Sequence, residues 1–378
     1  MKHFLTLGWI ILSSLCLSCA RPFDEFSKSK SGNIPKQYLI IKTLGNSQIL
    51  GYGARLTERS VPVIEGEVLY TGSVRGYFLA LKKTSGSVVW RKKIKGGVES
   101  SPYYLNEKIY FGANDGNFYC VEAKTGKTLW TYATHSEIYS QPLIKGGIVY
   151  FITAKNELLA LKAETGQWVW YHNKGYVQKF SLRGTSSPLY DDGKIYAGFS
   201  DGSLVAFNAF TGEIVWERLL SKEEKFIDVD ATPVMVGDTL YAGTGDGHLY
   251  ALEARTGNTR WQKKFQGIQN LETDQKKLYV ADLSHKVSAL NLEDGKKIWD
   301  FEVKKGVPSD MLMVEGQMVF GTSEGYIYSL SIDEGKELWR YKTDSGFFTK
   351  PVFNADRLYL YTQMSSIHVI DPFYLLAE

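Results

Sequence analysis

Cysteine is scarce in this chain of 378 residues, and its scarcity limits how the fold can be stabilised. The three cysteines are Cys16, Cys19 and Cys120, and the first two close an N-terminal apolar run. Only Cys120 is left for the rest of the chain, so no disulfide can form within it. We therefore expect Cys120 to be a packing residue and the fold to depend on its hydrophobic core, for which a hydrophobic content of 44% is sufficient.

Excess charge is also lacking. The chain has 44 Lys and Arg against 41 Asp and Glu, a formal net charge of +3, and no block of Lys or Arg stands out. Proteins that bind nucleic acids through their charge usually concentrate basic residues in a patch or stripe. We therefore expect no nucleic-acid partner.

Motifs for catalysis and metal binding are missing as well. The sequence contains no H-x-x-x-H pair, no G-x-S-x-G, no P-loop and no complete EF-hand pattern. Three Asp-Gly steps, which begin at Asp115, Asp201 and Asp246, occur at the same place in successive repeats and are typical of hairpin turns. We expect a protein that is not an enzyme, with no catalytic residue, no metal site and no cofactor.

A repeated unit is what the sequence does contain. In Thr232–Trp261, three apolar runs of strand length (Val234–Val236, Thr239–Gly243 and His248–Leu252) are separated by Gly-Asp and Gly-Asp-Gly. A fourth run follows Thr256-Gly257 and carries Trp261. Short β-rich runs broken by such turns predict a four-stranded antiparallel meander.

Three markers recur in fixed register in seven copies of this unit, which are about 40 residues long. The closing tryptophans are Trp90, Trp130, Trp170, Trp216, Trp261, Trp299 and Trp339. A glycine precedes each by four residues: Gly86, Gly126, Gly166, Gly212, Gly257, Gly295 and Gly335. A small residue precedes each by ten: Ala80, Cys120, Ala160, Ala206, Ala251, Ala289 and Ser329. The glycine permits a turn with positive φ, the small residue leaves room for a neighbouring indole, and the tryptophan packs between adjacent sheets.

Repeats of this length with four strands each predict an all-β fold, a β-propeller with tryptophan-docked blades. An eighth copy in Lys350–Pro372 has three strands, around Val352, Leu358–Thr362 and Ile367–Ile370, and lacks the closing Gly-x-x-x-Trp. Tyr38–Leu44 is the obvious donor of the missing strand, because an unpaired edge would otherwise remain. We predict eight blades closed by this N-terminal strand; the alternative is seven blades and an extra terminal strand.

The N-terminus has the pattern of a bacterial export signal. A polar start and an apolar run of 14 residues, too short to span a bilayer comfortably, lead to C-L-S-C. This pattern resembles a lipobox, which would make Cys19 the lipidated residue; the alternative is ordinary secretion with cleavage near Ala20. Ala20 after the cysteine favours the outer membrane. We predict a signal peptide in 1–18, a flexible lipid-anchored tether in 19–36, the propeller in 37–372 and a tail in 373–378.

Two connections between repeats are longer than the others. The distance from the closing tryptophan to the next proline is 12 residues in most copies, but 18 from Trp170 to Pro188 and 17 from Trp216 to Pro233. Consecutive insertions lie next to each other on one face of a propeller, commonly the binding face. We predict a partner-docking patch, made of Phe180, Leu182, Arg183, Asp228 and Asp230. The alternative is a salt bridge from Arg183 to an aspartate that only orders the two loops.

Two families resemble this sequence. The repeats resemble the scaffold of the pyrroloquinoline-quinone dehydrogenases, which are longer and use a vicinal Cys-Cys pair that this mature chain lacks. The motifs L-R-G-x-S-x-P and D-V-D-x-T-P on consecutive repeats behind a lipobox closely resemble the BamB family, the lipoproteins of the outer-membrane β-barrel assembly machinery. This resemblance covers about residues 38–372, and Phe180 stands where the family pattern often has Leu.

The BamB resemblance implies a scaffold without enzymatic activity, lipid-anchored to the outer membrane and facing the periplasm. It implies that the five patch residues contact the POTRA domains of the central barrel subunit. The protein would be a monomer within a hetero-complex and would help to insert unfolded outer-membrane proteins. The alternative is an envelope lipoprotein that binds glycan or cell-wall fragments on the propeller face; a quinone enzyme is a third possibility.

Overall fold

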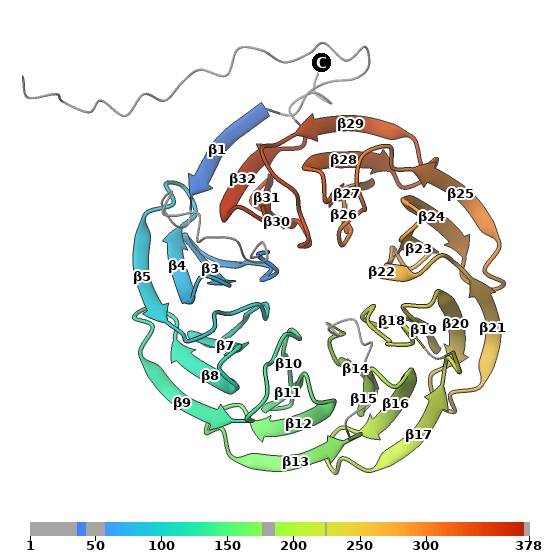
Figure 1. Ribbon diagram of the computed structural model, residues 1–378, viewed down its shortest axis with the longest axis horizontal. Helices are drawn as coiled ribbons and strands as arrows, with labels where there is room; N and C mark the ends of the chain where they lie inside the picture. The colour runs from blue at the N-terminus through green and yellow to red at the C-terminus, as the bar shows by residue number, and fades with distance from the viewer. Residues whose placement is uncertain (1–35, 43–56, 176–185, 224, 374–378) are drawn as a thin grey trace, which may run out of the picture. The chain divides into compact units, whose positions relative to one another are not determined.

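The computed structural model describes residues 36–42, 57–175, 186–223 and 225–373. These residues form eight four-stranded antiparallel sheets, which are arranged as the blades of a ring (Figure 1). The all-β, eight-bladed propeller predicted from the repeats is confirmed. Within the described residues, no helix has the length and apolar character needed to cross a bilayer.

Seven blades have an inner strand of three residues and a longer outer strand, whereas the inner and outer strands of the sixth blade both have six residues. The strands of the first four blades are β2 (Val63–Glu65), β3 (Val68–Ser73), β4 (Tyr77–Lys82), β5 (Val88–Lys93); β6 (Tyr103–Leu105), β7 (Lys108–Gly112), β8 (Asn117–Glu122), β9 (Thr128–Ala133); β10 (Leu143–Lys145), β11 (Ile148–Ile152), β12 (Glu157–Lys162), β13 (Trp168–Asn173); β14 (Leu189–Asp191), β15 (Lys194–Gly198), β16 (Ser203–Asn208) and β17 (Ile214–Leu219). Those of the last four are β18 (Val234–Val236), β19 (Thr239–Gly243), β20 (His248–Glu253), β21 (Thr259–Lys264); β22 (Ile268–Thr273), β23 (Lys277–Asp282), β24 (Lys286–Asn291), β25 (Lys297–Glu302); β26 (Leu312–Val314), β27 (Gln317–Gly321), β28 (Tyr326–Ser331), β29 (Glu337–Lys342); β30 (Val352–Asn354), β31 (Arg357–Tyr361), β32 (Ser366–Asp371) and β1 (Lys36–Lys42).

The eighth blade joins the two ends of the chain. Its strand order is β1-β32-β31-β30, with β1 as the outer strand. Strand β1 pairs antiparallel with β32 from Lys36 opposite Asp371 to Lys42 opposite Ser366. The predicted N-terminal closing strand is therefore confirmed, although it begins and ends two residues before the expected Tyr38–Leu44. The seven-bladed alternative is wrong.

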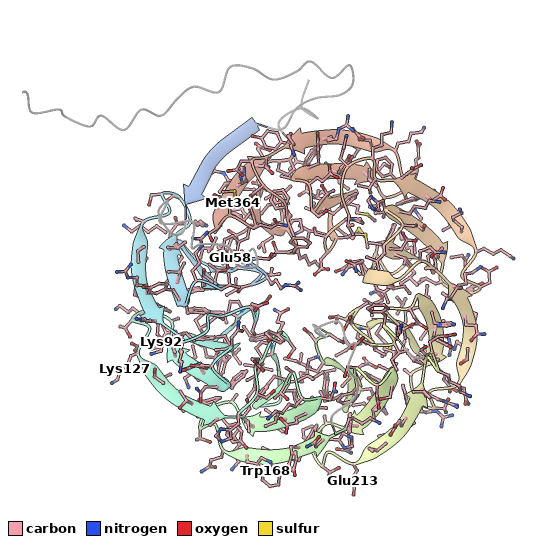
Figure 2. All side chains as sticks on the ribbon, viewed as in Figure 1. Glu58, Lys92, Lys127, Trp168, Glu213 and Met364 are labelled. Carbon is pink, nitrogen blue, oxygen red and sulfur yellow. The ribbon has the colours of Figure 1, made fainter. Side chains whose placement is uncertain are left out.

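A buried carboxylate adds a second connection at this closure. The Glu58 side chain, on the connector that leads into the first blade, is 1% exposed. It accepts hydrogen bonds from Ser73 Oγ (2.8 Å) and from the amide of Val74 (3.0 Å) in the first blade. It also accepts one from Ser365 Oγ (2.6 Å) in the eighth blade. Figure 2 shows Glu58 on the inner side of the ring, near the meeting of these two blades.

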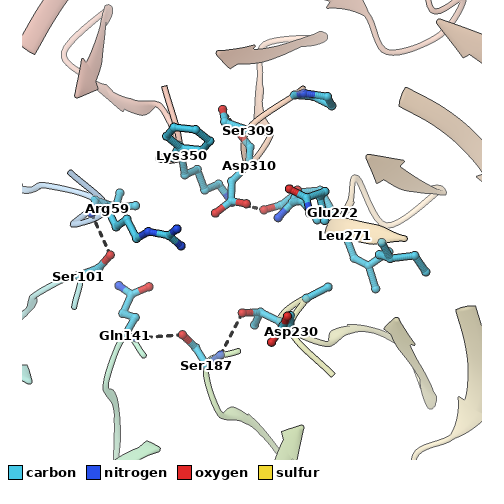
Figure 3. Close-up of a pocket in the computed structure, with 18 of the residues that line it drawn as sticks. Arg59, Ser101, Gln141, Ser187, Asp230, Leu271, Glu272, Ser309, Asp310 and Lys350 are labelled. Carbon is cyan, nitrogen blue, oxygen red and sulfur yellow. Dashed lines mark hydrogen bonds and ion pairs between the residues drawn. The ribbon is translucent and has the colours of Figure 1, made fainter. Parts of the chain in front are cut away.

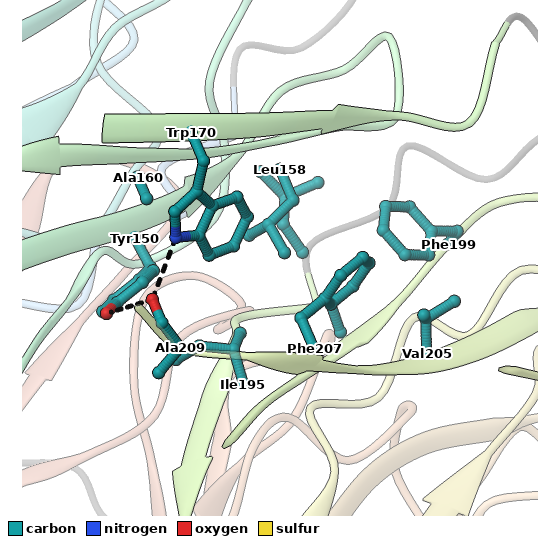
Figure 4. Close-up of a cluster of buried hydrophobic side chains, with 11 residues drawn as sticks. Tyr150, Leu158, Ala160, Trp170, Ile195, Phe199, Val205, Phe207 and Ala209 are labelled. Atoms are coloured by element: carbon teal, nitrogen blue, oxygen red, sulfur yellow. Dashed lines mark hydrogen bonds between the residues drawn. The ribbon is translucent and has the colours of Figure 1, made fainter. Parts of the chain in front are cut away.

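The tryptophans connect adjacent blades through polar and apolar contacts. Trp170 on β13 donates a hydrogen bond from Nε1 to the carbonyl of Ala209 in the next blade, at 2.9 Å, and the hydroxyl of Tyr150 donates to the same carbonyl at 2.9 Å (Figure 4). Five more tryptophans donate to the equivalent carbonyl of their neighbouring blade: Trp90, Trp130, Trp216, Trp261 and Trp299. The core thus consists of one apolar layer between each pair of blades, such as the cluster around Trp170 and Phe207.

The last tryptophan has a different acceptor. Trp339 donates to Gln317 Oε1 within its own blade, at 3.2 Å. Its neighbour, the eighth blade, takes its outer strand from the other end of the chain, as β1.

The indole for which the small residue of each repeat leaves room is that of the neighbouring strand in its own blade. Ala160 lies opposite Trp170 of the same blade, and Cys120 lies opposite Trp130. The neighbouring blade instead approaches the indole with its turn glycine: a Cβ placed on Gly212 would lie 2.6 Å from Cδ2 of Trp170. Cys120 is free and buried, in keeping with a packing role.

Candidate functional site in the axial cavity

A cavity of about 520 Å³ lies at the centre of the ring and is lined by residues from all eight blades (Figure 3). Most of these residues belong to the connectors that run from the outer strand of one blade to the inner strand of the next. In the sixth blade, β22 itself supplies the lining, from Ile268 to Glu272.

Strand-like alternation decides which connector residues face the cavity. Glu99 and Ser101, three residues and one residue before Pro102, line it. Ser100 between them points away and is fully buried; its hydroxyl donates to the carbonyl of Ser140 at 2.8 Å. Successive side chains of an extended segment point to opposite sides. The same register places Asp230 and Thr232, which precede Pro233, on the cavity wall.

Hydrogen bonds between blades hold this inner layer in place. The backbone amide of Val61 donates to Ser101 Oγ at 2.9 Å, and the backbone amide of Gln141 donates to Ser187 Oγ at 3.1 Å. The amide of Ser187 in turn donates to Thr232 Oγ1 at 3.1 Å. Each contact joins one blade to the next, so the cavity wall is fixed by the closed ring.

Charged side chains of both signs line the cavity. Arg59 Nε lies 3.7 Å from Glu99 Oε2, and Lys350 Nζ donates to Glu272 Oε1. Asp310 lies nearby, on the seventh blade. Burial raises the pKa of Asp310 to about 6; Glu272 adds to this rise, and Lys350 opposes it. Arg59 and Lys350 are thus each already paired with a carboxylate, Arg59 with that of Glu99 and Lys350 with that of Glu272.

Asp230 is the least compensated of these groups. Its side chain is partly exposed to the cavity, but its Oδ1 is buried and accepts no hydrogen bond within the described structure. Burial raises the pKa of Asp230 to about 8; the Asp228 carboxylate contributes to this rise, and Arg59 opposes it. A buried carboxylate without a partner is costly to ionise.

The structure covers only part of the predicted docking patch. Phe180, Leu182 and Arg183 lie outside the described residues, as does Cys19 with the predicted signal peptide. Asp228 and Asp230 are described, and they differ. Asp228 is 1% exposed, so its side chain is not part of an exposed contact surface as predicted, whereas Asp230 faces the axial cavity.

Local packing explains why Asp228 is buried. Val229, the next residue, is 1% exposed and packs over Gly198 in the preceding blade, where an added Cβ would lie 2.5 Å from Val229 Cγ1. The carbonyl of Asp228 accepts a hydrogen bond from the amide of Gly245 at 2.8 Å. These contacts hold the end of the second insertion tightly between two blades, with Asp228 inside it.

Five charged residues of the cavity escaped the sequence prediction: Arg59, Glu99, Glu272, Asp310 and Lys350. Three of them could have been found, because Arg59 and Glu99 lie three residues before Pro62 and Pro102, and Lys350 lies one residue before Pro351, at the positions that face the axis. The sixth and seventh repeats have no proline at this point. Their cavity residues, Glu272 and Asp310, could be aligned only after the strands were known.

The residues of the cavity do not match those of a quinone enzyme. The free cysteine of the described chain, Cys120, is buried in the second blade, opposite Trp130. Within the described residues, no group of three or more His, Cys, Asp or Glu side chains is placed to hold a metal ion. Within the described part of this wall, the vicinal cysteine pair of the quinone enzymes therefore has no counterpart.

The fold and the axial cavity define an eight-bladed β-propeller whose blades are docked by tryptophans. Among solved structures, the chain is similar to BamB from Moraxella catarrhalis, with a TM-score of 0.75, 21% identity, and coverage of 89% of this chain and 100% of that one. It is also similar to the quinohemoprotein alcohol dehydrogenase from Comamonas testosteroni, with a TM-score of 0.69, 13% identity, and coverage of 84% and 75%. At these identities, the similarity establishes the fold alone.

The family follows from the sequence. The family model described as "Outer membrane protein assembly factor BamB" matches residues 43–119, 107–299 and 284–372, and the chain belongs to this family. BamB of Salmonella typhimurium is 26% identical over 149 residues, which are 39% of this chain and 38% of that protein. The match to Escherichia coli BamB is 25% identical, with the same coverage. A quinoprotein ethanol dehydrogenase of Pseudomonas putida matches over 65 residues at 31% identity, which is only 10% of that protein. The matches thus span well under half the length of these curated relatives.

Proposed function

We propose that this protein is a scaffold of the machinery that assembles β-barrel proteins in the outer membrane, and that it has no enzymatic activity. The observation that carries the proposal is the match to the BamB family model, which extends from residue 43 to residue 372 and so includes strands β2 to β32. The relatives in Salmonella typhimurium and Escherichia coli are named as outer-membrane protein assembly factors. Both motifs that resemble the family, around Arg183 and Asp230, lie within the matched range.

We propose that the protein docks to POTRA domains of the central barrel subunit through Phe180, Leu182, Arg183 and Asp230. The fifth residue of the predicted patch, Asp228, is buried. Apolar side chains beside fixed charges are typical of the few residues that carry most of the binding energy in an interface. Docked in this way, the protein would assist the insertion of unfolded outer-membrane proteins, as a monomer within a hetero-complex.

We also propose that the protein is a lipoprotein of the outer membrane that faces the periplasm. Residues 1–18 would be the signal peptide, Cys19 the lipidated residue and 19–36 the tether to the propeller in 37–372, with a tail in 373–378. Metabolic labelling with palmitate should mark the wild type but not Cys19→Ser. Equal labelling of the two would contradict lipidation at Cys19.

Charge reversals test the docking surface. Arg183→Glu and Asp230→Arg should each weaken the free energy of binding to a POTRA-bearing barrel protein by about 2–4 kcal/mol, as expected for residues at the centre of an interface. Less of that protein should then co-purify with either variant. The matched controls are Arg255→Glu and Asp333→Arg, which reverse charges on side chains that are 80% and 83% exposed. Circular dichroism should show the β spectrum of all four variants unchanged. Normal co-purification of both site variants would overturn the docking assignment.

A further inference from the structure

The axial cavity has a surplus of acidic groups. Among the described residues that line it, there are four carboxyl groups, those of Glu99, Asp230, Glu272 and Asp310, against two basic groups, those of Arg59 and Lys350. Each basic group already contacts a carboxylate, Arg59 that of Glu99 and Lys350 that of Glu272. Once these carboxyl groups are ionised, a cavity with low-dielectric walls concentrates their field and attracts ions of the opposite sign.

Asp230 is the point at which this surplus can bind a ligand. Its Oδ1 is buried and accepts no hydrogen bond from any described residue, although the side chain lies on the cavity wall. A buried polar atom that lacks a partner usually has a structural or functional explanation. Asp228 on the same connector adds negative charge, and Arg59 supplies only a weak counter-charge because it is paired with Glu99.

The surroundings of Asp230 favour an organic cation over a metal ion. Apolar side chains lie on the same wall, Val234 and Ile268 among them, and amides from Gln141 and Gln269 line the cavity. A divalent metal ion prefers several oxygen ligands at one point, and the described residues offer no group of three acidic or imidazole side chains for one. An alkyl chain that ends in a cation suits these surroundings. The chain would contact the apolar side chains, and the cation would pair with the carboxylate of Asp230 and donate hydrogen bonds to the nearby amide oxygens.

We propose that the axial cavity is a binding site for an alkyl ammonium or alkyl guanidinium group, which pairs with the carboxylate of Asp230. The volume of about 520 Å³ is within the range of small-molecule sites. The cation can come from a free amine of the envelope or from a Lys or Arg side chain of a docked protein. The site itself does not depend on the docking function proposed above.

Calorimetric titration of the full chain with butylguanidinium and butylammonium tests the site directly. At pH 9, above the pKa of about 8 of Asp230, the wild type should bind at least one of these cations saturably. Binding should be about tenfold weaker in Asp230→Asn and should be unchanged in Asp333→Asn, which removes the same charge from an exposed side chain. Asp230→Glu, which retains the carboxylate, should bind more tightly than Asp230→Asn.

The pH dependence provides a second readout. Binding to the wild type should weaken by about tenfold from pH 9 to pH 6, because Asp230 becomes protonated while both cations keep their charge. The same change of pH should have little effect on Asp230→Asn. If neither cation binds the wild type saturably, or if Asp230→Asn binds as tightly as the wild type, the proposal is overturned.

A competition experiment distinguishes the two sources of the cation. The protein is bound to its partner from solubilised envelopes and washed with butylguanidinium or with sodium chloride of equal ionic strength. Release by butylguanidinium alone supports a basic side chain of the partner in the cavity, whereas equal retention supports a free amine as the ligand. Failure to retain any partner would contradict the docking function and leave the calorimetric result intact.

Discussion

The indole of Trp170 packs against the turn glycine Gly212 of the next blade so closely that a Cβ on Gly212 would lie 2.6 Å from its ring. Gly212 also has a φ of +75°. The glycine therefore meets two requirements, a left-handed turn and the absence of a side chain where the indole lies. The same contact recurs in five other pairs: Gly126 with Trp90, Gly166 with Trp130, Gly257 with Trp216, Gly295 with Trp261 and Gly335 with Trp299.

Alanine substitution separates these two requirements. Gly193 has a φ of +74° and nothing within 4 Å of an added Cβ. Gly193→Ala should therefore cost only the left-handed strain, about 1–2 kcal/mol. Gly212→Ala should cost about 1–3 kcal/mol more, because the methyl group overpacks the site against Trp170. Urea unfolding measures both, and equal losses of stability would contradict the role of Gly212 in packing.

Truncation of the indole tests how much one docked tryptophan contributes. Trp170 is 6% exposed, whereas Trp168 on the same strand is 55% exposed and projects from the outer rim (Figure 2). Trp170→Ala should reduce the free energy of unfolding by about 3–5 kcal/mol. Trp168→Ala should change it by less than about 1 kcal/mol. Similar losses in denaturant unfolding would show that burial between blades does not stabilise the ring.

Glu58 should matter for ring closure. Glu58→Ala removes the acceptor of three hydrogen bonds, from Ser73, Val74 and Ser365, and leaves buried donors without partners. We expect a loss of about 1–3 kcal/mol in the free energy of unfolding. Glu67→Ala is the control, because that side chain is 73% exposed and pairs with Lys83 at 3.3 Å on the surface. Hydrogen exchange should increase most in the first and eighth blades; a uniform increase around the ring would argue against a local closure contact.

Asp230 should make stability depend on pH. Its pKa is raised from 3.8 to about 8 in the fold, so the folded protein holds this proton more tightly than the unfolded chain. The resulting stabilisation is complete below about pH 4 and is lost as the pH rises towards 8. The free energy of unfolding of Asp230→Asn, relative to that of the wild type, should therefore increase between pH 4 and pH 8 and then level off. Parallel curves for the two proteins in denaturant titrations would contradict the raised pKa.

The sequence was sufficient for most of the fold because the markers of each repeat are local. In the unit Thr232–Trp261 the expected strands Val234–Val236 and Thr239–Gly243 are those observed, and β20 extends one residue beyond the expected Leu252. Turn glycines and the alternation of apolar residues fix such hairpins without reference to distant parts of the chain. The missing strand of the eighth copy was predictable for the same reason, because the repeat count showed that one outer strand was absent.

The candidate site was predictable only in part. The sequence placed Asp228 and Asp230 on the second insertion but did not distinguish their surroundings. Asp228 is buried beside Val229, which packs over Gly198, whereas Asp230 faces the axis. This difference depends on how the connector packs against the preceding blade, which is a contact between residues about 30 positions apart.

By itself, the sequence determined the number of blades, the strands within them and the residues that dock one blade on the next, because each of these depends on turn chemistry and periodicity within about 40 residues. Only the tertiary structure decided that Arg59, Glu99, Asp230, Glu272, Asp310 and Lys350 share one cavity. These residues are separated by up to 291 positions in the sequence. Closure of the ring brings them together, and their charges affect one another only at that short distance.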